Sequence, residues 1–371
     1  MTAAFDKISK VLATSLHLSA DELRSAFGRA THTDLPEICQ LMQLGFGEVN
    51  NLRADVLAWR YFNFSKQGSD IFVLRHKGGI IGAVGTEPLI VKIGDQVCTG
   101  IRAGDIVVHP DYLKSGIGAW MNLYLQNEFP IAMAMGSNKN SNTMVRRLFK
   151  AMNCRHHLKI LFSTRAYFEA KGLPSAVARI LSAISIVPLR LIRLLANKSL
   201  EDKYTVSVMT DTANLAEFFN DPDYKVRAQS IVLRSADYCH WRYDLNPISR
   251  FFTFEMRQAK RLIGYAIVKQ PHTEAGGDWQ LMDWDLLASA RTEQIYQELF
   301  SAVVDWVAET SAESLSVMTS DQLSIDSLLH SGFSHRAVED GFFLWANAEV
   351  DAAVLNEKQW FLSFCDTDEA L

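Results

Sequence analysis

The sequence predicts a mixed α/β (α+β) fold made of two related domains in tandem. The chain has 371 residues, which is more than a single hydrophobic core usually supports. Short sequence elements of the first half recur in the second half at a nearly constant distance. Within the first half, strands joined by tight turns come first, and an alternation of strands and helices in the order β-α-β-α-β follows them.

The recurring elements are a Trp-Arg-Tyr triplet, an aliphatic pair followed by glycine, and the end of an expected helix. The first two recur 182 positions later and the third 180 positions later. Three matches in nearly one register indicate an internal repeat. The matching segments are 59–61 with 241–243, 80–83 with 262–265, and 148–152 with 328–332. We therefore expect a first domain over residues 1–165, a connecting segment over 166–205, and a second domain with a C-terminal tail over 206–371.

Local patterns place the elements of the first half. Asp34 followed by Pro36 and Glu37 is typical of a helix start. Aliphatic and β-branched runs bounded by glycine turns predict strands. Longer runs without breakers that follow a glycine or asparagine predict helices. We expect strands at 70–75, 80–91, 97–108, 131–135 and 157–165, and helices at 116–129 and 142–152.

Composition argues against several classes of function. The net charge is −5 and no Lys/Arg cluster occurs, so we expect no nucleic-acid partner. The five cysteines form no CxxC pair, and His156-His157 has no acidic or cysteine partner at ligand spacing. We therefore expect neither a disulfide framework nor a metal site. The first residues predict an amphipathic helix rather than a secretion signal, so the expected location is cytoplasmic.

One segment has an unusual distribution of charge. No acidic residue occurs between Glu169 and Glu201, whereas several arginines and lysines lie there among aliphatic residues. The favoured interpretation is a linker element packed between two domains and broken by Pro174 and Pro188. The alternative is a weak contact with a membrane surface through 172–198, because basic amphipathic segments bind anionic lipid.

The chemically informative stretch runs from Asp105 to Ala119. A strand ends at Pro110, and Gly116-Ile-Gly118 then opens a helix. The free N–H groups of a helix start carry partial positive charge, and successive amides of a tight turn form a concave anion site. Lys114 adds a mobile cation. This stretch therefore predicts a site for a pyrophosphate or another anion.

The combination of strand, V-x-P turn, cation and G-x-G-A resembles the acetyl-CoA signature of the GNAT N-acetyltransferase superfamily. Phe27 to Pro36 resembles the first strand and helix start of that family, and 142–152 is similar to its last conserved helix. The resemblance covers residues 27–165 well and 206–345 in outline. It implies two GNAT-like domains, each a mostly antiparallel twisted sheet flanked by helices.

The resemblance also implies acetyl-CoA as co-substrate and a small amine, such as an amino sugar, as acceptor. By position in the motif, the pantetheine arm would pair with the backbone of Ile106, Val107 and Val108. Asn142 would lie near the pantetheine arm and the sulfur. The pyrophosphate would lie on the turn and helix start, formed by Lys114, Ser115, Gly116, Ile117, Gly118 and Ala119.

Two positions depart from the family pattern. Leu113 stands where an arginine or glutamine is usual, and Phe149 stands where a tyrosine often acts as general acid. Tyr112 and Tyr124 are the alternative hydroxyls. Asp105 is the first candidate for the general base and Glu87 the second, and a structural hydrogen-bonding role is the alternative for each.

The second half has no glycine at the position of the first half's turn. Side chains around Ser289, Thr292 and Glu293 would crowd a pyrophosphate there, so we expect one acetyl-CoA per chain. Two alternatives to an N-acetyltransferase are compatible with the sequence. One is a non-catalytic acyl-CoA-binding or membrane-associated scaffold. The other is a tRNA-dependent aminoacyl transferase, which the acidic balance of the chain does not favour.

Overall fold

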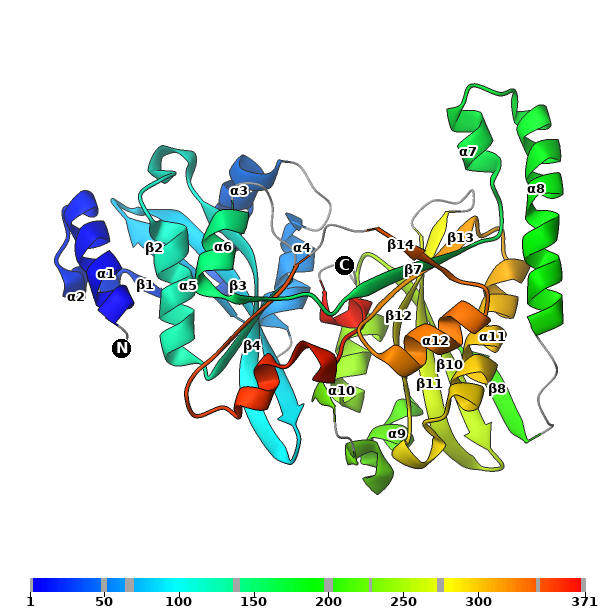
Figure 1. Ribbon diagram of the computed structural model, residues 1–371. Coiled ribbons are helices and arrows are strands. Elements are labelled where there is room, and N and C mark those ends of the chain that lie inside the picture. Colours follow the sequence, from blue (N-terminus) through cyan, green and yellow to red (C-terminus); the bar gives the residue numbers. More distant parts are fainter. Residues whose placement is uncertain are drawn as a thin grey trace. The chain divides into compact units, whose positions relative to one another are not determined.

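A computed structural model describes residues 3–47, 52–63, 70–135, 141–196, 203–226, 229–271, 277–337 and 341–367 (Figure 1). The chain forms two compact units, neither of which is continuous in sequence. Unit 1 contains residues 1–153, 230–233 and 340–359. Unit 2 contains residues 154–229, 234–339 and 360–371. Each unit is built around one sheet, as expected of two tandem domains.

The sheet of unit 1 has the strand order β1-β2-β3-β4-β5-β15-β6, and β9 pairs with β3. Its strand β15 comes from the far end of the chain and pairs with both β5 and β6. Only the β4–β5 pair along this order is parallel. The strands are β1 Phe27–Arg29, β2 Asp70–His76, β3 Gly79–Ile93, β4 Gln96–Val108, β5 Ile131–Met135, β6 Lys150–Met152, β9 Ser230–Val232 and β15 Phe342–Ala346.

The sheet of unit 2 has the order β14-β7-β13-β12-β11-β10-β8. Its strand β7 comes from the first half of the sequence and lies between β13 and β14. Again one pair along this order, β12 with β13, is parallel. The strands are β7 His156–Leu161, β8 Tyr204–Met209, β10 Arg250–Gln258, β11 Arg261–Gln270, β12 Asp278–Leu286, β13 Ser314–Thr319 and β14 Ser334–Arg336.

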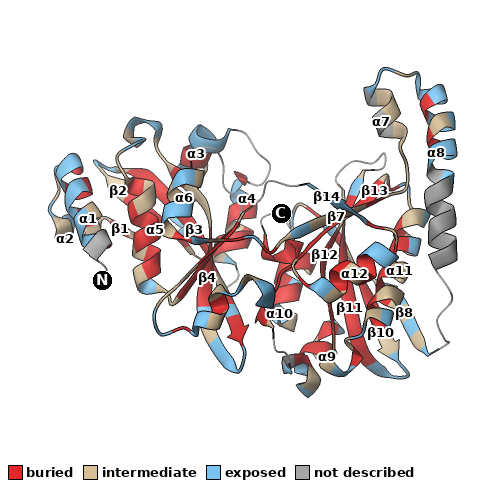
Figure 2. Cartoon of the chain, in the orientation of Figure 1, coloured by how far each residue is buried: buried red, intermediate tan, exposed pale blue. Residues whose placement is uncertain are grey.

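Neighbouring residues of a strand point to opposite faces of a sheet. The unit 1 sheet therefore has a core on each face, and helices cover both. Phe72 joins the core that contains Trp120, while Ile71 joins the core that contains Ile38. The buried strands are red in Figure 2. The helices are α1 Ala3–Leu16, α2 Ala20–Ser25, α3 Leu35–Phe46, α4 Ala54–Leu57, α5 Ile117–Glu128 and α6 Asn142–Leu148, with the π-helical turn η3 at Ala58–Phe62.

Unit 2 has its own set of helices, of which α8 is the longest described. We expected Pro188 to interrupt this segment, but α8 continues through that position. Among the described residues, no helix has both the length and the apolarity that crossing a membrane requires. The helices are α7 Arg165–Ala170, α8 Ser175–Ala196, α9 Leu215–Asn220, α10 Ala236–Cys239, α11 Glu293–Glu309 and α12 Gln322–His330, with the π-helical turn η6 at His240–Asp244.

The internal repeat has a structural counterpart. The Trp-Arg-Tyr triplets lie in the two π-helical turns, η3 and η6, and both tryptophans are buried. One element differs from expectation, because the helix expected over 142–152 ends at Leu148 and residues 150–152 form β6. The reason is tertiary, since β6 pairs with β15.

Candidate functional site

The described pairing between the two parallel strands of unit 1 ends two residues before Asp105. Pairing between β4 and β5 runs from Ile101 opposite Ala132 to Ala103 opposite Ala134, and no later pair occurs between the described parts of these strands. Asp105 has a φ of 49°, and the register between β3 and β4 shifts at this point. A bulge of this kind bends one strand away from its neighbour.

Beyond the bulge, β4 keeps one partner. Val107 and Val108 pair with β3 opposite Ala83 and Gly82. On their other edge, Ile106–Val108 pair with no described strand, because the β4–β5 pairs end at Ala103. Backbone groups on such an edge can pair with an extended ligand in the way that a sheet accepts an added strand.

The strand leads into a turn with two left-handed residues. The 3₁₀ turn η4, Pro110–Tyr112, is followed by Lys114 with a φ of 71° and Gly116 with a φ of 90°. Gly116 is the N-cap of α5 and places no side chain over the helix start. The first amides of α5 have no intrahelical acceptor, and Lys114 is exposed. The turn therefore has the backbone form of an anion site, with a cation beside it.

Two neighbouring helices of unit 1 pack around this helix start. The indole nitrogen of Trp120 donates to Ser9 Oγ at 2.8 Å, and Phe5 stacks on the same indole. A methyl group on Gly116 would lie 3.8 Å from Ile8 of α1, and one on Gly118 would lie 3.6 Å from Met144 of α6. The turn is thus fixed by α1 and α6, and Asn142 begins the helix that contacts it.

The two candidate bases, Asp105 and Glu87, belong to one network with the first Trp-Arg-Tyr element. Arg60 donates to Asp105 Oδ2 at 2.7 Å and to Glu87 Oε1 at 2.5 Å. Tyr61 donates to the same Asp105 oxygen at 2.6 Å. Arg102, opposite Glu87 in the sheet, donates to the other Glu87 oxygen. The Asp105 side chain is 17% exposed and that of Glu87 is 4% exposed, so Asp105 is the more accessible of the two.

The candidate hydroxyls lie apart from this network. Tyr112 follows the strand and lines an open cavity of about 340 Å³ with His76 and His109, which lie edge-on to its ring. Tyr124 lies in the aromatic core beside Phe27, and burial raises the pKa of its hydroxyl. Phe149 is buried in the same core.

The counterpart of the site in unit 2 lacks the turn. The parallel pairs of β12 and β13 also stop, at Leu281 opposite Val317. No residue from 287 to 292 has a positive φ. The N-cap of α11 is Thr292, whose hydroxyl accepts from Ile295 N–H at 3.3 Å. A side chain therefore occupies the helix start that glycine leaves open in unit 1.

The C-terminal segment Trp360–Thr367 lies over the separated strands of unit 2. Ser363 bridges to Thr319 at the end of β13, and its hydroxyl donates to Asp283 of β12 at 3.1 Å. Trp360 accepts from Ser320 at 2.6 Å. Most of this segment is buried. The chain's own tail thus lies beside the end of β13, beyond the last pair of β13 with β12.

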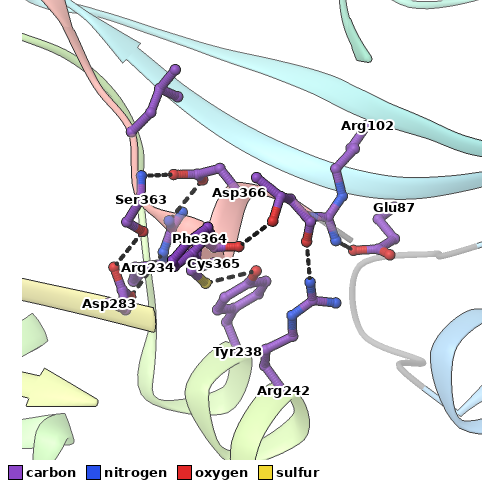
Figure 3. A network of polar contacts seen from close by, with 12 residues as sticks. Glu87, Arg102, Arg234, Tyr238, Arg242, Asp283, Ser363, Phe364, Cys365 and Asp366 are labelled. Atoms are coloured by element: carbon purple, nitrogen blue, oxygen red, sulfur yellow. Dashed lines mark hydrogen bonds and ion pairs between the residues drawn. The ribbon is translucent and has the colours of Figure 1, made fainter. Parts of the chain in front are cut away.

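A buried ion cluster fixes this tail (Figure 3). Arg234 donates to Asp283 at 3.2 Å and to Asp366 at 2.7 Å. Tyr265 also donates to Asp283, at 3.1 Å, and Arg242 donates to the carbonyl of Thr367 at 2.9 Å. The second Trp-Arg-Tyr element therefore binds the tail, whereas the first binds the candidate base.

Sequence reasoning found the turn and the carboxylates but not their partners. Arg60 and Tyr61 were visible only as part of a repeated triplet, and nothing local to the triplet identified Asp105 as their acceptor. The role of the tail had no local signal, apart from apolar residues alternating with acidic ones near the C-terminus. Among the described residues, no cluster of His, Cys, Asp or Glu is arranged to hold a metal ion.

Comparisons with known proteins bear on the fold. No family model matches the sequence, and no curated protein matches it. A GCN5-related N-acetyltransferase from Anabaena variabilis is similar in structure, with a TM-score of 0.57 and 12% identity over 86% of this chain and 71% of that chain. A probable N-acyltransferase from Enterococcus faecalis has the same TM-score at 11% identity, with 86% and 71% covered.

A tandem GNAT protein from the clavulanic acid biosynthesis pathway is similar over 86% of this chain and 97% of its own. Its TM-score is 0.50 and its identity is 13%. At such identities the likeness concerns the fold, and both the sheets and the tandem layout agree with it. The chain therefore has the tandem GNAT fold that its sequence predicted.

Proposed function

We propose that the protein is an N-acetyltransferase that moves an acetyl group from acetyl-CoA to a small amine, such as an amino sugar. The observation that carries this proposal is the joint geometry of β4 and α5. A strand edge at Ile106–Val108 that pairs with no described strand leads directly into a turn at Lys114–Ala119 with the backbone form of an anion site. An extended arm that ends in a pyrophosphate fits this pairing of strand edge and turn. Similarity to acyltransferase folds supports the proposal.

In the proposed reaction the acceptor amine attacks the thioester carbonyl of acetyl-CoA in a ternary complex. A carbon–nitrogen bond forms, the carbon–sulfur bond breaks, and coenzyme A leaves as thiolate. Asp105 would take the amine proton, directly or through water, because its carboxylate is partly exposed and lies just beyond the last β4–β5 pair. Arg60 and Tyr61 would orient it. Glu87 would hold Arg60 and Arg102 in place. It is also the second candidate for the general base.

Protonation of the leaving thiolate would need a donor other than Phe149. Phe149 has no proton to give, and it is buried. Tyr112 is the proposed donor, although one strand segment and a turn separate it from Asp105 along the chain. Release as free thiolate is the alternative, and it needs no donor because a thiol ionises near pH 8.5. Asn142 is proposed to lie near the sulfur.

Binding of acetyl-CoA is tested by thermal shift. A ligand that binds only the folded chain stabilises it and so raises its melting temperature. At a ligand concentration of 100 times the dissociation constant, the free energy of unfolding rises by about 2.7 kcal/mol. We expect a clear rise for wild type and none for Gly118→Glu, whose side chain places negative charge at the helix start. Gly116→Glu tests the same site, but its positive φ adds backbone strain.

The matched control for Gly116→Glu is Gly94→Glu. Gly94 also has a positive φ, and it lies in the β3–β4 hairpin turn with open space around it. This variant suffers the same backbone strain but leaves the proposed site unchanged, so its shift with acetyl-CoA is expected to equal that of wild type. The absence of any shift in wild type would rule out the acetyl-CoA assignment.

One acetyl-CoA is expected per chain. Unit 2 has a side-chain cap at the equivalent helix start, and the tail covers its separated strands. Titration calorimetry is therefore expected to show a single site. Two equivalent sites per chain would contradict both the sequence argument and this interpretation of the tail.

Replacing Asp105 by asparagine separates catalysis from binding. Asparagine keeps an oxygen that can accept from Tyr61, but it cannot take a proton. We expect turnover to fall by about 10²- to 10⁴-fold, measured as release of free thiol with a panel of amines, while the melting shift with acetyl-CoA is kept. If wild type binds acetyl-CoA and no amine gives turnover, the non-catalytic scaffold becomes the better description.

A further inference from the structure

Helix α8 is held to unit 2 by one narrow face. Ala178 and Ser182 are buried on this face. The Ser182 hydroxyl accepts from the backbone N–H of Thr164 at 2.9 Å, and the hydroxyls of Thr164 and Ser185 are 2.6 Å apart. These contacts fix the rotation of the helix about its axis, so the direction of its remaining described side chains is defined.

The opposite side of α8 carries an exposed apolar stripe. Val177 is 42% exposed, Ile180 62%, Ile184 64% and Val187 48%. Their spacing of three, four and three residues places them on one side of a helix. These four are the densest group among the exposed large apolar side chains of the described chain. In Figure 2, the described part of α8 carries several pale blue segments, which mark exposed residues.

The charged residues of the segment that contains the stripe are all of one sign. Residues 170–200 contain five basic residues and no acidic one, although the whole chain carries a net charge of −5. Glu169, the acidic residue just before them, is paired with Arg165 at 2.8 Å. An apolar stripe in a segment whose charged residues are all basic is complementary to an anionic surface that has an apolar interior.

We propose that α8 binds the surface of a membrane that contains anionic phospholipid. The apolar stripe enters the interfacial region, and the basic residues contact the lipid headgroups. The helix lies along the surface, because the described helices include none that could cross a membrane. A second copy of the chain fits less well, since pairing two such helices would bring basic residues together without an acidic partner.

The experiment is co-sedimentation of the full chain with vesicles, in the absence of acetyl-CoA. Vesicles of phosphatidylcholine with phosphatidylglycerol are expected to pellet the protein at low salt, whereas vesicles of phosphatidylcholine alone pellet little. High salt should weaken the binding, because headgroup attraction is screened. The double variant Ile180→Asp/Ile184→Asp should reduce the pelleted fraction by about tenfold or more, because it places two carboxylates in the contact.

Val11→Asp is the matched control. Val11 lies on α1 and is 61% exposed, so this variant replaces an equally exposed apolar residue on another helix. The variant should bind vesicles as well as wild type does. All three proteins should melt at similar temperatures, because the replaced side chains are on the surface. Equal binding to both vesicle types, or full binding by the double variant, would overturn the proposal. The proposal would also be overturned if sedimentation velocity shows a dimer for wild type and a monomer for the double variant. Vesicle binding and acetyl-CoA binding are measured separately, so either can fail alone.

Discussion

Replacing Arg234 by methionine is expected to lower the free energy of unfolding by about 3–5 kcal/mol, as breaking a buried ion pair usually does. Arg234 is 3% exposed and lies between the carboxylates of Asp283 and Asp366. The variant leaves these two carboxylates buried without their shared cation. Chemical denaturation of wild type and variant measures the difference.

This loss should depend on pH. Burial raises the pKa of Asp283, and the charge of Arg234 lowers it. Without the arginine the pKa rises further above the ordinary value of 3.8. A carboxyl whose pKa is higher in the folded than in the unfolded state destabilises the fold as pH rises through that interval. The variant should therefore lose less stability at about pH 5 than at about pH 8.

Arg261→Met provides the control. Arg261 makes a comparable pair with Asp221 at 2.9 Å, but it is 49% exposed. Exposed pairs of this kind contribute about 0–1 kcal/mol. A loss of the same size in both variants would show that burial of the Arg234 cluster is not what makes it important. A loss for Arg234→Met that does not change with pH would argue against the unpaired carboxylates as its cause.

The predictable parts of the fold are those specified by nearby residues. Strands β3 and β4 were expected because aliphatic runs flank the turn at Ile93–Gln96, and the structure confirms both. The start of α5 was expected from Gly116, whose positive φ suits glycine. In these cases the signal lies within a few residues of the element.

The parts that could not be predicted depend on distant residues. Residues 150–152 have a helical pattern but form β6, because β15 provides a partner nearly two hundred residues later. The bulge at Asp105 and its contacts with Arg60 likewise connect segments far apart in sequence. A single sequence identified Asp105 as a candidate base, but it gave no sign that the same carboxylate is held by an arginine and a tyrosine.

Expressed alone, residues 1–205 are expected not to fold cooperatively. Strand β15 pairs with β5 on one side and β6 on the other, so β6 loses its place in the sheet without it. Phe342, Phe343 and Leu344 are almost completely buried in the whole chain. Burying each such side chain contributes about 1.5–3 kcal/mol, and the sum is comparable with the whole stability of a typical domain, about 5–15 kcal/mol. Circular dichroism melting of the fragment measures this.

The decisive comparison is the same fragment with residues 341–359 joined to its C-terminus by a flexible linker. Grafting restores the partner of β5 and β6, so cooperative melting should return. A cooperative transition of the ungrafted fragment would contradict the prediction. The result also bears on function, because β5 is the strand that pairs with β4 just before Asp105. Without β15, β5 loses the partner on one edge and keeps only β4 on the other. The grafted fragment should therefore regain the acetyl-CoA melting shift together with its fold, even though β15 contributes none of the proposed binding residues.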